Sequence, residues 1–276
     1  MAKKIKLVAI DLDGTLLTSD KKVTENTIKT LKKVIEQGII VVIATGRPIL
    51  GLDTVIQEVP RSPYILTTNG ARIVNIETGE VMLERLIPHE VVLEIFDVLR
   101  KYDCVKEIFY KGQGFVSTED FERIHLYHIK PEMIEYFQRT RKPIPDLIEY
   151  IKETKGNGDK AQAIFRDMKV REQVWKELQD LGKLNLTDSL SYNIEINAKG
   201  VEKGSSLKFL VEKLGILQEE VMALGDGSND VRMLEYAGMG VAMGNAREEI
   251  KRVANVVTAS NDDEGVAKAL EQYILN

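Results

Sequence analysis

Cysteine and histidine are scarce in this chain of 276 residues, which has one cysteine and three histidines. A lone Cys104 excludes an intramolecular disulfide and fits a reducing compartment, so we expect a cytoplasmic protein. No catalytic partner motif surrounds Cys104, and we interpret it as a small buried hydrophobic residue. His125 and His128 stand three residues apart, but no third ligand lies near them in the sequence, which argues against a metal site there.

Long hydrophobic runs and an excess of basic residues are also absent. The first apolar run ends at Asp11, which is too short for a signal peptide or a membrane span. The 38 basic and 43 acidic residues give a net charge of −5, which argues against binding nucleic acid through phosphate neutralisation. A hydrophobic content of 43% is typical of a soluble globular protein. We therefore expect neither a membrane nor a nucleic-acid partner.

Short apolar runs alternate with helical patterns near both ends of the chain. Lys6 to Ile10 and Val221 to Leu224 are rich in Val, Ile and Leu, which is typical of buried strands in a parallel sheet. Alternating strands and helices predict an α/β fold with a doubly wound, Rossmann-like parallel sheet. Strands are expected at 6–10, 39–44, 64–66, 221–224, 240–243 and 255–257, and helices at 24–37, 48–57, 201–214, 230–237 and from 263.

A different pattern occupies the middle of the chain. A hairpin is expected around Gly112-Gln113-Gly114, and prolines at 143 and 145 interrupt the polar helices. We interpret the basic run Arg139-Thr-Arg-Lys142 as a solvated face. Helices are expected at 88–102, 119–127, 131–137 and 171–181, and strands at 108–117, 161–165 and 189–197. The sequence thus predicts a core domain made of 1–83 and 200–276, with an α+β cap domain inserted at 84–199.

Polar residues follow four of the expected core strands, namely Asp11, Thr45, Asn69 and Asp226. Ligands of an open parallel sheet bind at the carboxyl ends of its strands, so we expect these side chains to meet there. Carboxylates gathered at one edge would repel one another unless a cation lay between them. The pattern indicates a hard divalent metal, most plausibly Mg2+, and chemistry on a phosphate.

Two further residues support a phosphate site. Asp13 lies two positions after Asp11, on the same side of an extended backbone, so both carboxylates can face one ligand. On its own, such a pair is more often an ordinary turn. Lys203 begins the helix expected after residue 201, where a cation opposes the helix dipole. That mismatch is explained if Lys203 and the helix N-terminus hold an anion together; the alternative is a solvated lysine.

In combination, these motifs resemble the haloacid-dehalogenase superfamily of phosphotransferases, and in particular its Cof-type branch. The resemblance covers the core, whereas the insert is similar only in size and position. The segments that carry it are Asp11-Leu-Asp-Gly-Thr15, Ala44-Thr-Gly-Arg47, Thr68-Asn-Gly-Ala71, Lys199-Gly-Val-Glu-Lys-Gly204, Gly225-Asp-Gly-Ser-Asn-Asp230 and Ser260-Asn-Asp-Asp-Glu-Gly-Val-Ala267.

The resemblance implies a role for each matching residue. Asp11 would be the nucleophile that forms an aspartyl-phosphate, and Asp13 the general acid and base. Mg2+ would be bound by Asp11, the backbone carbonyl of Asp13, and Asp226, with Asp230 orienting this shell or capping the next helix. Phosphate and substrate would be held by Thr45, Gly46, Arg47, Asn69, Lys203 and Asn229.

The function expected from the sequence is therefore a Mg2+-dependent phosphatase acting on small phosphorylated metabolites. Sugar phosphates are the commonest substrates of the family branch that it resembles. Two alternatives stay open: a phosphomutase, and a non-enzymatic module switched by phosphorylation of Asp11. The substrate cannot be predicted, because the insert carries no motif that would select it. A monomer and a small homo-oligomer both fit the sequence.

Overall fold

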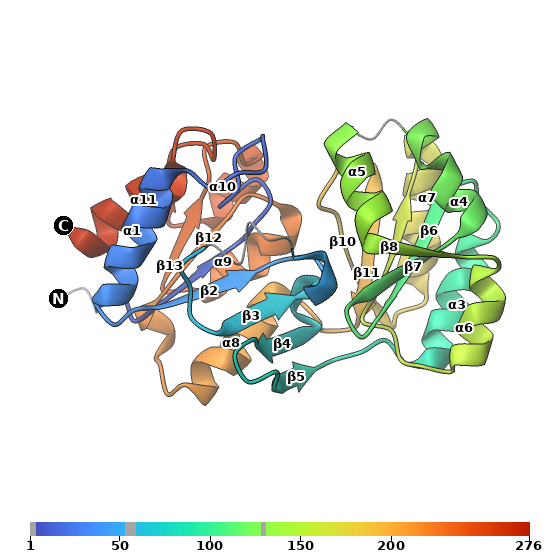
Figure 1. The fold of residues 1–276 in the computed structure, drawn as a ribbon, viewed down its shortest axis with the longest axis horizontal. Helices are drawn as coiled ribbons and strands as arrows, with labels where there is room; N and C mark the ends of the chain where they lie inside the picture. Colours follow the sequence, from blue (N-terminus) through green and yellow to red (C-terminus); the bar gives the residue numbers. More distant parts are fainter. Residues whose placement is uncertain (1–3, 53–58, 128–130) are drawn as a thin grey trace. The chain divides into compact units, whose positions relative to one another are not determined.

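The structure is a computed structural model that describes residues 4–52, 59–127 and 131–276. The chain forms two compact units (Figure 1). The first unit consists of Met1–Gly46, Leu52–Glu84 and Glu202–Asn276. The second unit consists of Arg47–Gly51 and Arg85–Val201. Each unit has its own sheet and is described separately.

The first unit is built on an eight-stranded sheet with the order β14-β13-β12-β1-β2-β3-β4-β5. The six strands from β14 to β3 are parallel to one another, and the pairs β3–β4 and β4–β5 are antiparallel. The doubly wound parallel sheet predicted from the sequence is thus confirmed. Its strands are β1 (Leu7–Ile10), β2 (Ile40–Ala44), β3 (Tyr64–Thr67), β4 (Arg72–Asn75), β5 (Val81–Glu84), β12 (Val221–Gly225), β13 (Met239–Ala242) and β14 (Val256–Val257).

The middle of this sheet joins the two ends of the chain. Strand β1 pairs in parallel with β12, with Leu7 opposite Val221. Every residue of β1 and β12 is buried, which explains why both read as continuous apolar runs instead of alternating patterns. The carboxyl ends of these two strands therefore lie side by side, and each is followed by an aspartate-rich loop.

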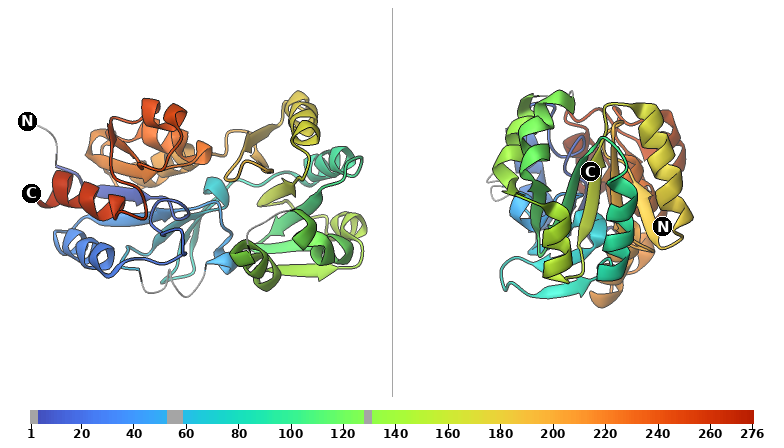
Figure 2. Two further views of the ribbon diagram at one scale, coloured as in Figure 1. Left: turned by 90° about the horizontal axis from the view of Figure 1, so that it is seen from above. Right: turned by 90° about the vertical axis from the view of Figure 1, so that its right-hand side faces the viewer.

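Helices cover both faces of the sheet. On one face, α1 (Glu25–Glu36) and α11 (Gly265–Leu270) lie side by side and contribute Leu31 and Leu270 to one apolar cluster (Figure 2). On the other face, α8 (Lys203–Lys213) and α9 (Val231–Tyr236) contribute Leu207 and Met233 to a second cluster. A further helix is α10 (Glu248–Val253), and α11 continues into a π-helical turn at Glu271–Leu275. Short 3-10 turns lie at Thr68–Gly70, Gln218–Glu220 and Ser228–Asp230.

The second unit contains a six-stranded sheet with the order β10-β11-β9-β6-β7-β8, antiparallel except for the β7–β8 pair. Three helices, α3 (His89–Leu99), α6 (Leu147–Thr154) and α7 (Met168–Asp180), contribute to its main apolar cluster. Its strands are β6 (Val105–Tyr110), β7 (Gln113–Ser117), β8 (Arg141–Ile144), β9 (Lys160–Ile164), β10 (Leu184–Thr187) and β11 (Asn193–Ala198). Its other helices are α4 (Thr118–Arg123) and α5 (Pro131–Thr140), with 3-10 turns at Ile124–Tyr127 and Ile49–Gly51.

The interpretation of residues 139–142 as a solvated face is wrong for Arg141. Its side chain is buried, and its Nε donates to a carboxylate oxygen of the fully buried Glu107. The guanidinium also lies 4.9 Å from the ring centroid of Phe109. Residues from Arg141 onward form β8, an edge strand, which is a position where Pro143 can be accommodated. The run of basic residues does not indicate that Arg141 pairs with Glu107, which lies 34 residues earlier in the chain.

Other expected elements differ in extent. The strand expected at 189–197 begins only at Asn193, because the side-chain oxygen of Asn193 accepts the N–H groups of Ser189 and Leu190 and forms a turn. Strands β4, β5, β8 and β10 and helices α6 and α10 were not expected from the sequence. Of the helix expected at 48–57, the structure shows a 3-10 turn at Ile49–Gly51, and residues 53–58 lie outside the described residues.

The scarce residues can be placed in part. Cys104 is buried, as expected, and burial raises the pKa of its thiol to about 12, so it stays protonated. The ring Nδ1 of His125 lies 2.9 Å from the carbonyl oxygen of Glu122. His128 lies outside the described residues.

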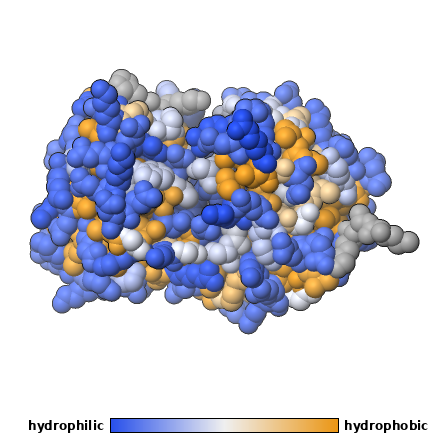
Figure 3. Space-filling model, turned by 180° about the vertical axis from the view of Figure 1, so that it is seen from behind, coloured by the Kyte–Doolittle hydropathy of each residue, from blue (hydrophilic) through white to orange (hydrophobic). Residues whose placement is uncertain are grey.

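The surface of the described residues is largely hydrophilic, as the face in Figure 3 illustrates. Large exposed hydrophobic side chains are scattered over different elements, which is ordinary for a folded protein. They are Leu50, Val81, Leu126, Met168, Leu217 and Val257. Within residues 4–52, 59–127 and 131–276, no helix combines the length and apolar character needed to cross a membrane.

Candidate active site

Three aspartates meet at the carboxyl end of the first unit's sheet. Asp11 follows β1, and Asp226 and Asp230 belong to the loop that follows β12. One carboxylate oxygen from each of the three lies within 4.8 Å of the others, and this trio is called the acidic cluster below. The pairing of β1 with β12 causes this meeting, because it places two loops from opposite ends of the chain next to each other.

Lys203 lies against the acidic cluster. Its Nζ donates to Oδ1 of Asp11 at 2.5 Å and to Oδ1 of Asp230 at 2.6 Å, and its side chain is fully buried. Burial alone would lower the pKa of Lys203, but Asp11 and Asp230 outweigh it and raise that pKa, so the ammonium stays charged. The alternative of a solvated lysine is therefore wrong.

The acidic cluster holds more negative charge than Lys203 balances. Burial and then the charge of Asp230 raise the pKa of Asp11 well above its usual value, although Lys203 opposes them. Burial and Asp230 likewise raise the pKa of Asp226, to about 7. Raised values in two of three neighbouring carboxyl groups mean that their ionised forms lack a further positive partner. Carboxylate oxygens so arranged fit a hard divalent cation.

Asp230 holds the β12 loop in shape. Its Oδ2 accepts the backbone N–H groups of Asp226 at 3.0 Å and Gly227 at 2.9 Å, while Oδ1 accepts from Lys203. Both of its oxygens are therefore used by this chain. Asp230 orients Asp226 and Lys203, and this combines the capping and orienting roles considered from the sequence.

Gly14 lets Asp226 approach the loop that follows β1. The φ of Gly14 is +83°, a left-handed value that side-chain-bearing residues rarely adopt. A Cβ at this position would lie 2.4 Å from Oδ2 of Asp226. The next residue, Thr15, donates its hydroxyl to Oδ1 of Asp226 at 3.1 Å. Any side chain at position 14 would therefore displace the carboxylate.

Gly14→Ala should accordingly disrupt the site more than it disrupts the fold. Gly38→Ala is the matched control, because Gly38 has a φ of +80° but no atom within 4 Å of its would-be Cβ. Each variant should lose about 1–2 kcal/mol from backbone strain, measured by urea unfolding. Only Gly14→Ala should also lose the phosphatase turnover that is expected from the sequence. Equal activity of the two variants would contradict the need for close approach by Asp226.

A second set of polar residues follows β2 and β3. The side-chain amide of Asn229 donates to Oδ1 of Asn69 at 3.1 Å, and the backbone N–H of Asn69 donates to the carbonyl of Thr45 at 3.1 Å. Thr68 and Asn69 have φ values of +50° and +59°. Such values are costly for a β-branched residue and concentrate at functional sites. These contacts bring Thr45, Asn69 and Asn229 together as a set; Gly46 follows Thr45 directly.

Two further predicted site residues make contacts outside the acidic cluster. The carboxylate of Asp13 is half-buried and accepts a hydrogen bond from Nζ of Lys21 at 2.8 Å. Arg47 is grouped with the second unit, where its guanidinium lies 4.6 Å from the ring centroid of Tyr136.

The sequence did not predict roles for Thr15, Lys21 or Asn245. The side-chain amide of Asn245 donates to the carbonyl of Gly14 at 2.9 Å and to Oδ2 of Asp226 at 3.3 Å. Asn245 follows β13, a strand that was expected from the sequence. Because ligands bind at the carboxyl ends of parallel strands, Asn245 could have been predicted as a site residue. The ion pair of Lys21 with Asp13 depends on the loop conformation, in which Lys21 has a φ of +60°. No pattern in the sequence indicates this conformation.

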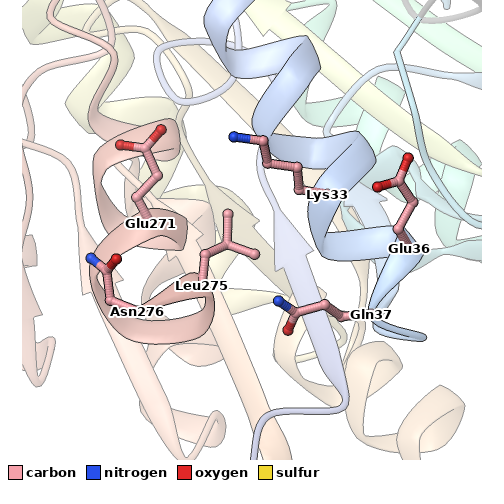
Figure 4. Close-up of a pocket in the computed structure, with 6 residues that line it drawn as sticks. All are labelled: Lys33, Glu36, Gln37, Glu271, Leu275 and Asn276. Atoms are coloured by element: carbon pink, nitrogen blue, oxygen red, sulfur yellow. The ribbon is translucent and has the colours of Figure 1, made fainter.

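A separate pocket lies between the end of α1 and the C-terminal turn (Figure 4). Its walls carry side chains of both charges, and none of the predicted site residues lines it. The lining residues are Lys33, Glu36, Gln37, Glu271, Leu275 and Asn276. This pocket is therefore not the candidate active site.

Comparison with known proteins decides the family. Residues 8–270 match the haloacid dehalogenase-like hydrolases. The chain belongs to this family. It is 31% identical over 272 residues to a 5-amino-6-(5-phospho-D-ribitylamino)uracil phosphatase of Bacillus subtilis (strain 168), covering 98% of this chain and 96% of that protein. It is also 31% identical over 286 residues to the phosphatase YwpJ of the same organism, covering 98% and 100%.

A solved structure agrees with this assignment. The crystal structure of a haloacid dehalogenase-like hydrolase from Bacteroides thetaiotaomicron matches with a TM-score of 0.81 and 33% identity, over 98% of this chain and 99% of that chain. The resemblance predicted from the motifs is confirmed, and the protein is a phosphoric monoester hydrolase of the haloacid dehalogenase-like family.

Proposed function

We propose that this haloacid dehalogenase-like phosphatase is Mg2+-dependent and hydrolyses small phosphorylated metabolites through an aspartyl-phosphate on Asp11. The observation that supports this proposal most is the environment of Asp11, a buried carboxylate held by Lys203 within the acidic cluster. Relatives named as phosphatases favour hydrolysis over the mutase and switch alternatives. A relative named for a phosphorylated ribityl compound supports sugar or polyol phosphates as the substrate class.

The metal would be held by Asp11, Asp226 and the backbone carbonyl of Asp13. Asp230 is a poorer ligand, because its Oδ1 accepts from the Lys203 ammonium and its Oδ2 accepts two backbone N–H groups, those of Asp226 and Gly227. Oxygen ligands in this number, with water and phosphate completing the shell, suit Mg2+. When bound, Mg2+ would supply the positive charge that the cluster lacks and would neutralise charge on the phosphate oxygens.

In the first step, an Asp11 carboxylate oxygen attacks the phosphorus atom, and the bond from phosphorus to the ester oxygen breaks. Among the described residues, no hydrogen bond reaches Oδ2 of Asp11, so this oxygen has its lone pairs available. Protonated Asp13 gives its proton to the leaving alcohol. Lys203 favours the ionised form of Asp11 and orients its carboxylate through the contact with Oδ1.

In the second step, Asp13 takes a proton from a water molecule, whose oxygen attacks the phosphorus atom of the aspartyl-phosphate. The bond between phosphorus and Asp11 breaks, releasing inorganic phosphate and restoring the Asp11 carboxylate. Thr45, Gly46, Asn69 and Asn229 would hold phosphate oxygens through their hydroxyl, amide and backbone N–H groups. Asp13 ends this cycle protonated and ready for the next substrate.

The test combines a substrate panel with metal removal. We expect phosphate release from one or a few compounds among sugar phosphates, polyol phosphates, nucleotides, flavin mononucleotide and pyridoxal phosphate when Mg2+ is present. EDTA should abolish this release, and added Mg2+ should restore it. Mg2+ without substrate should also raise the melting temperature, because a ligand that binds only the folded state stabilises it.

Asp226→Asn should lose both responses to Mg2+, whereas Asp180→Asn, at an exposed position at the end of α7, should keep them. Undiminished release in EDTA would contradict the metal requirement. A folded protein that releases phosphate from nothing in the panel would contradict the proposed substrate class.

A further inference from the structure

Asn245 is an exposed residue whose side chain is nevertheless held in one orientation. Its Oδ1 accepts the backbone N–H of Asn261 at 3.0 Å. This contact identifies which end of the amide is the oxygen, so Nδ2 must face the opposite way. Nδ2 donates there to the Gly14 carbonyl at 2.9 Å and to Oδ2 of Asp226 at 3.3 Å. A side chain at the surface thus reaches a carboxylate of the acidic cluster.

Both oxygens of the Asp226 carboxylate are therefore held by donors of this chain. Thr15 donates to Oδ1, and Asn245 donates to Oδ2. Two donors on opposite oxygens fix the plane of a carboxylate, whereas one donor leaves it free to rotate about its last bond. Asn245 also bridges from Asp226 to Gly14, the residue that follows Asp13. It thereby joins the two loops that would supply the metal ligands.

Asn245 is itself anchored by the segment 260–262. The side-chain amide of Asn261 donates to the Leu17 carbonyl at 2.9 Å, and the carboxylate of Asp262 accepts from the backbone and hydroxyl of Ser19, both at 2.7 Å. The same segment therefore holds Asn245 and the loop that follows β1. It belongs to the stretch 260–267, which matched the family pattern in the sequence without an assigned role.

We propose that Asn245 is a positioning residue for Asp226 and that it sets the metal affinity of the acidic cluster. This inference rests on the proposed metal-dependent function. Asn245 acts through Asp226: it holds the carboxylate plane toward Asp11 and opposes the repulsion between the two carboxylates. Loss of such a contact behind a metal ligand typically lowers metal affinity by about 10–100-fold.

A structural role alone would give a different result. Asn245 is exposed, and Asn261, which is buried and bonded to Leu17, carries the contact between the two loops of the fold. Truncating Asn245 should therefore change the metal-free melting temperature by no more than about 2 °C.

The experiment measures Mg2+ binding by titration calorimetry without substrate, for wild type, Asn245→Ala and Asn26→Ala. Asn26 is a matched control: it is also exposed and also donates through Nδ2 to a carboxylate, that of Glu264. We expect Asn245→Ala to bind Mg2+ about 10–100-fold more weakly and Asn26→Ala to bind it like wild type. The Mg2+ concentration that half-restores turnover after EDTA should rise by the same factor, with kcat at saturating Mg2+ recovered within a few-fold.

Equal Mg2+ affinity of Asn245→Ala and wild type would overturn the inference. The inference would also be overturned if Asn245→Ala lost Mg2+ affinity together with a large fall in its metal-free melting temperature. Such a combined loss is what we expect for Asn261→Ala, whose role is structural. Wild-type protein that hydrolyses phosphate esters but binds no Mg2+ would overturn the metal site and this inference with it. Wild-type protein that binds Mg2+ but hydrolyses nothing would overturn the proposed activity, while the affinities would still decide the role of Asn245.

Discussion

Asp11→Asn is expected to lower phosphate release by about 10⁴-fold or more, because an amide is a very poor nucleophile toward phosphorus. The fold should survive this change. Burial and the neighbouring carboxylates raise the pKa of Asp11, so the ionised group weakens the metal-free protein at neutral pH. A neutral asparagine removes that penalty, and the melting temperature at neutral pH should not fall.

Asp20→Asn is the matched control for this prediction, because Asp20 is exposed and lies in the loop that follows β1. It should keep turnover within a few-fold of wild type. Rapid acid quenching followed by mass spectrometry should detect a phosphoryl group on wild-type Asp11 and none in Asp11→Asn. If Asp11→Asn retained turnover within a few-fold of wild type, the nucleophile would have to be another group.

The sheet of the first unit could be predicted because its parallel strands are buried on both faces. Strands such as β1 and β12 then consist of Val, Ile, Leu, Met, Ala and Gly without polar interruptions, and a polar residue follows the end of each strand. These polar residues at the strand ends were enough to predict that Asp11 and Asp226 would lie close together. They could not predict β4 and β5, because only two residues of β4 and none of β5 are buried and neither strand is a continuous apolar run.

Contacts made by loops and across sheets could not be predicted in the same way. Arg141 and Glu107 form a buried pair between segments 34 residues apart, and neither residue type is ordinarily buried. Asn245 looks in the sequence like any turn residue after a strand, and only the position of Asn261 gives it a defined orientation. The contacts of such residues depend on how several loops pack together. A single sequence shows no local pattern from which this packing could be predicted.

The sequence indicated Lys203 as a candidate site residue but did not predict where its side chain lies. The expected role was to hold an anion at a helix N-terminus, which suggested that its removal would spare the fold. Its full burial between Asp11 and Asp230 changes that expectation. Removing one partner from a buried ion pair leaves uncompensated charge in a poorly solvated place.

Lys203→Met should therefore lose both turnover and stability. We expect turnover to fall by about 10²–10³-fold, as when an electrostatic stabiliser of a transition state is removed. The free energy of unfolding at neutral pH should fall by about 3–5 kcal/mol, measured by urea denaturation. Lys208→Met, at an exposed position of the same helix, should change neither quantity appreciably.

The stability loss should shrink as the pH is lowered, because Asp11, whose pKa is raised by burial and by Asp230, can then take up a proton and no longer needs a cation. The double variant Lys203→Met/Asp230→Asn should likewise recover part of the lost stability, since the oxygen of the introduced amide can still accept the N–H groups of Asp226 and Gly227. It should not recover turnover, because Asp11 would still lack its ammonium partner. If the double variant recovered turnover together with stability, the role of Lys203 would be in the fold alone. If Lys203→Met left the stability unaltered, the buried contacts of Lys203 with Asp11 and Asp230 would not stabilise the fold.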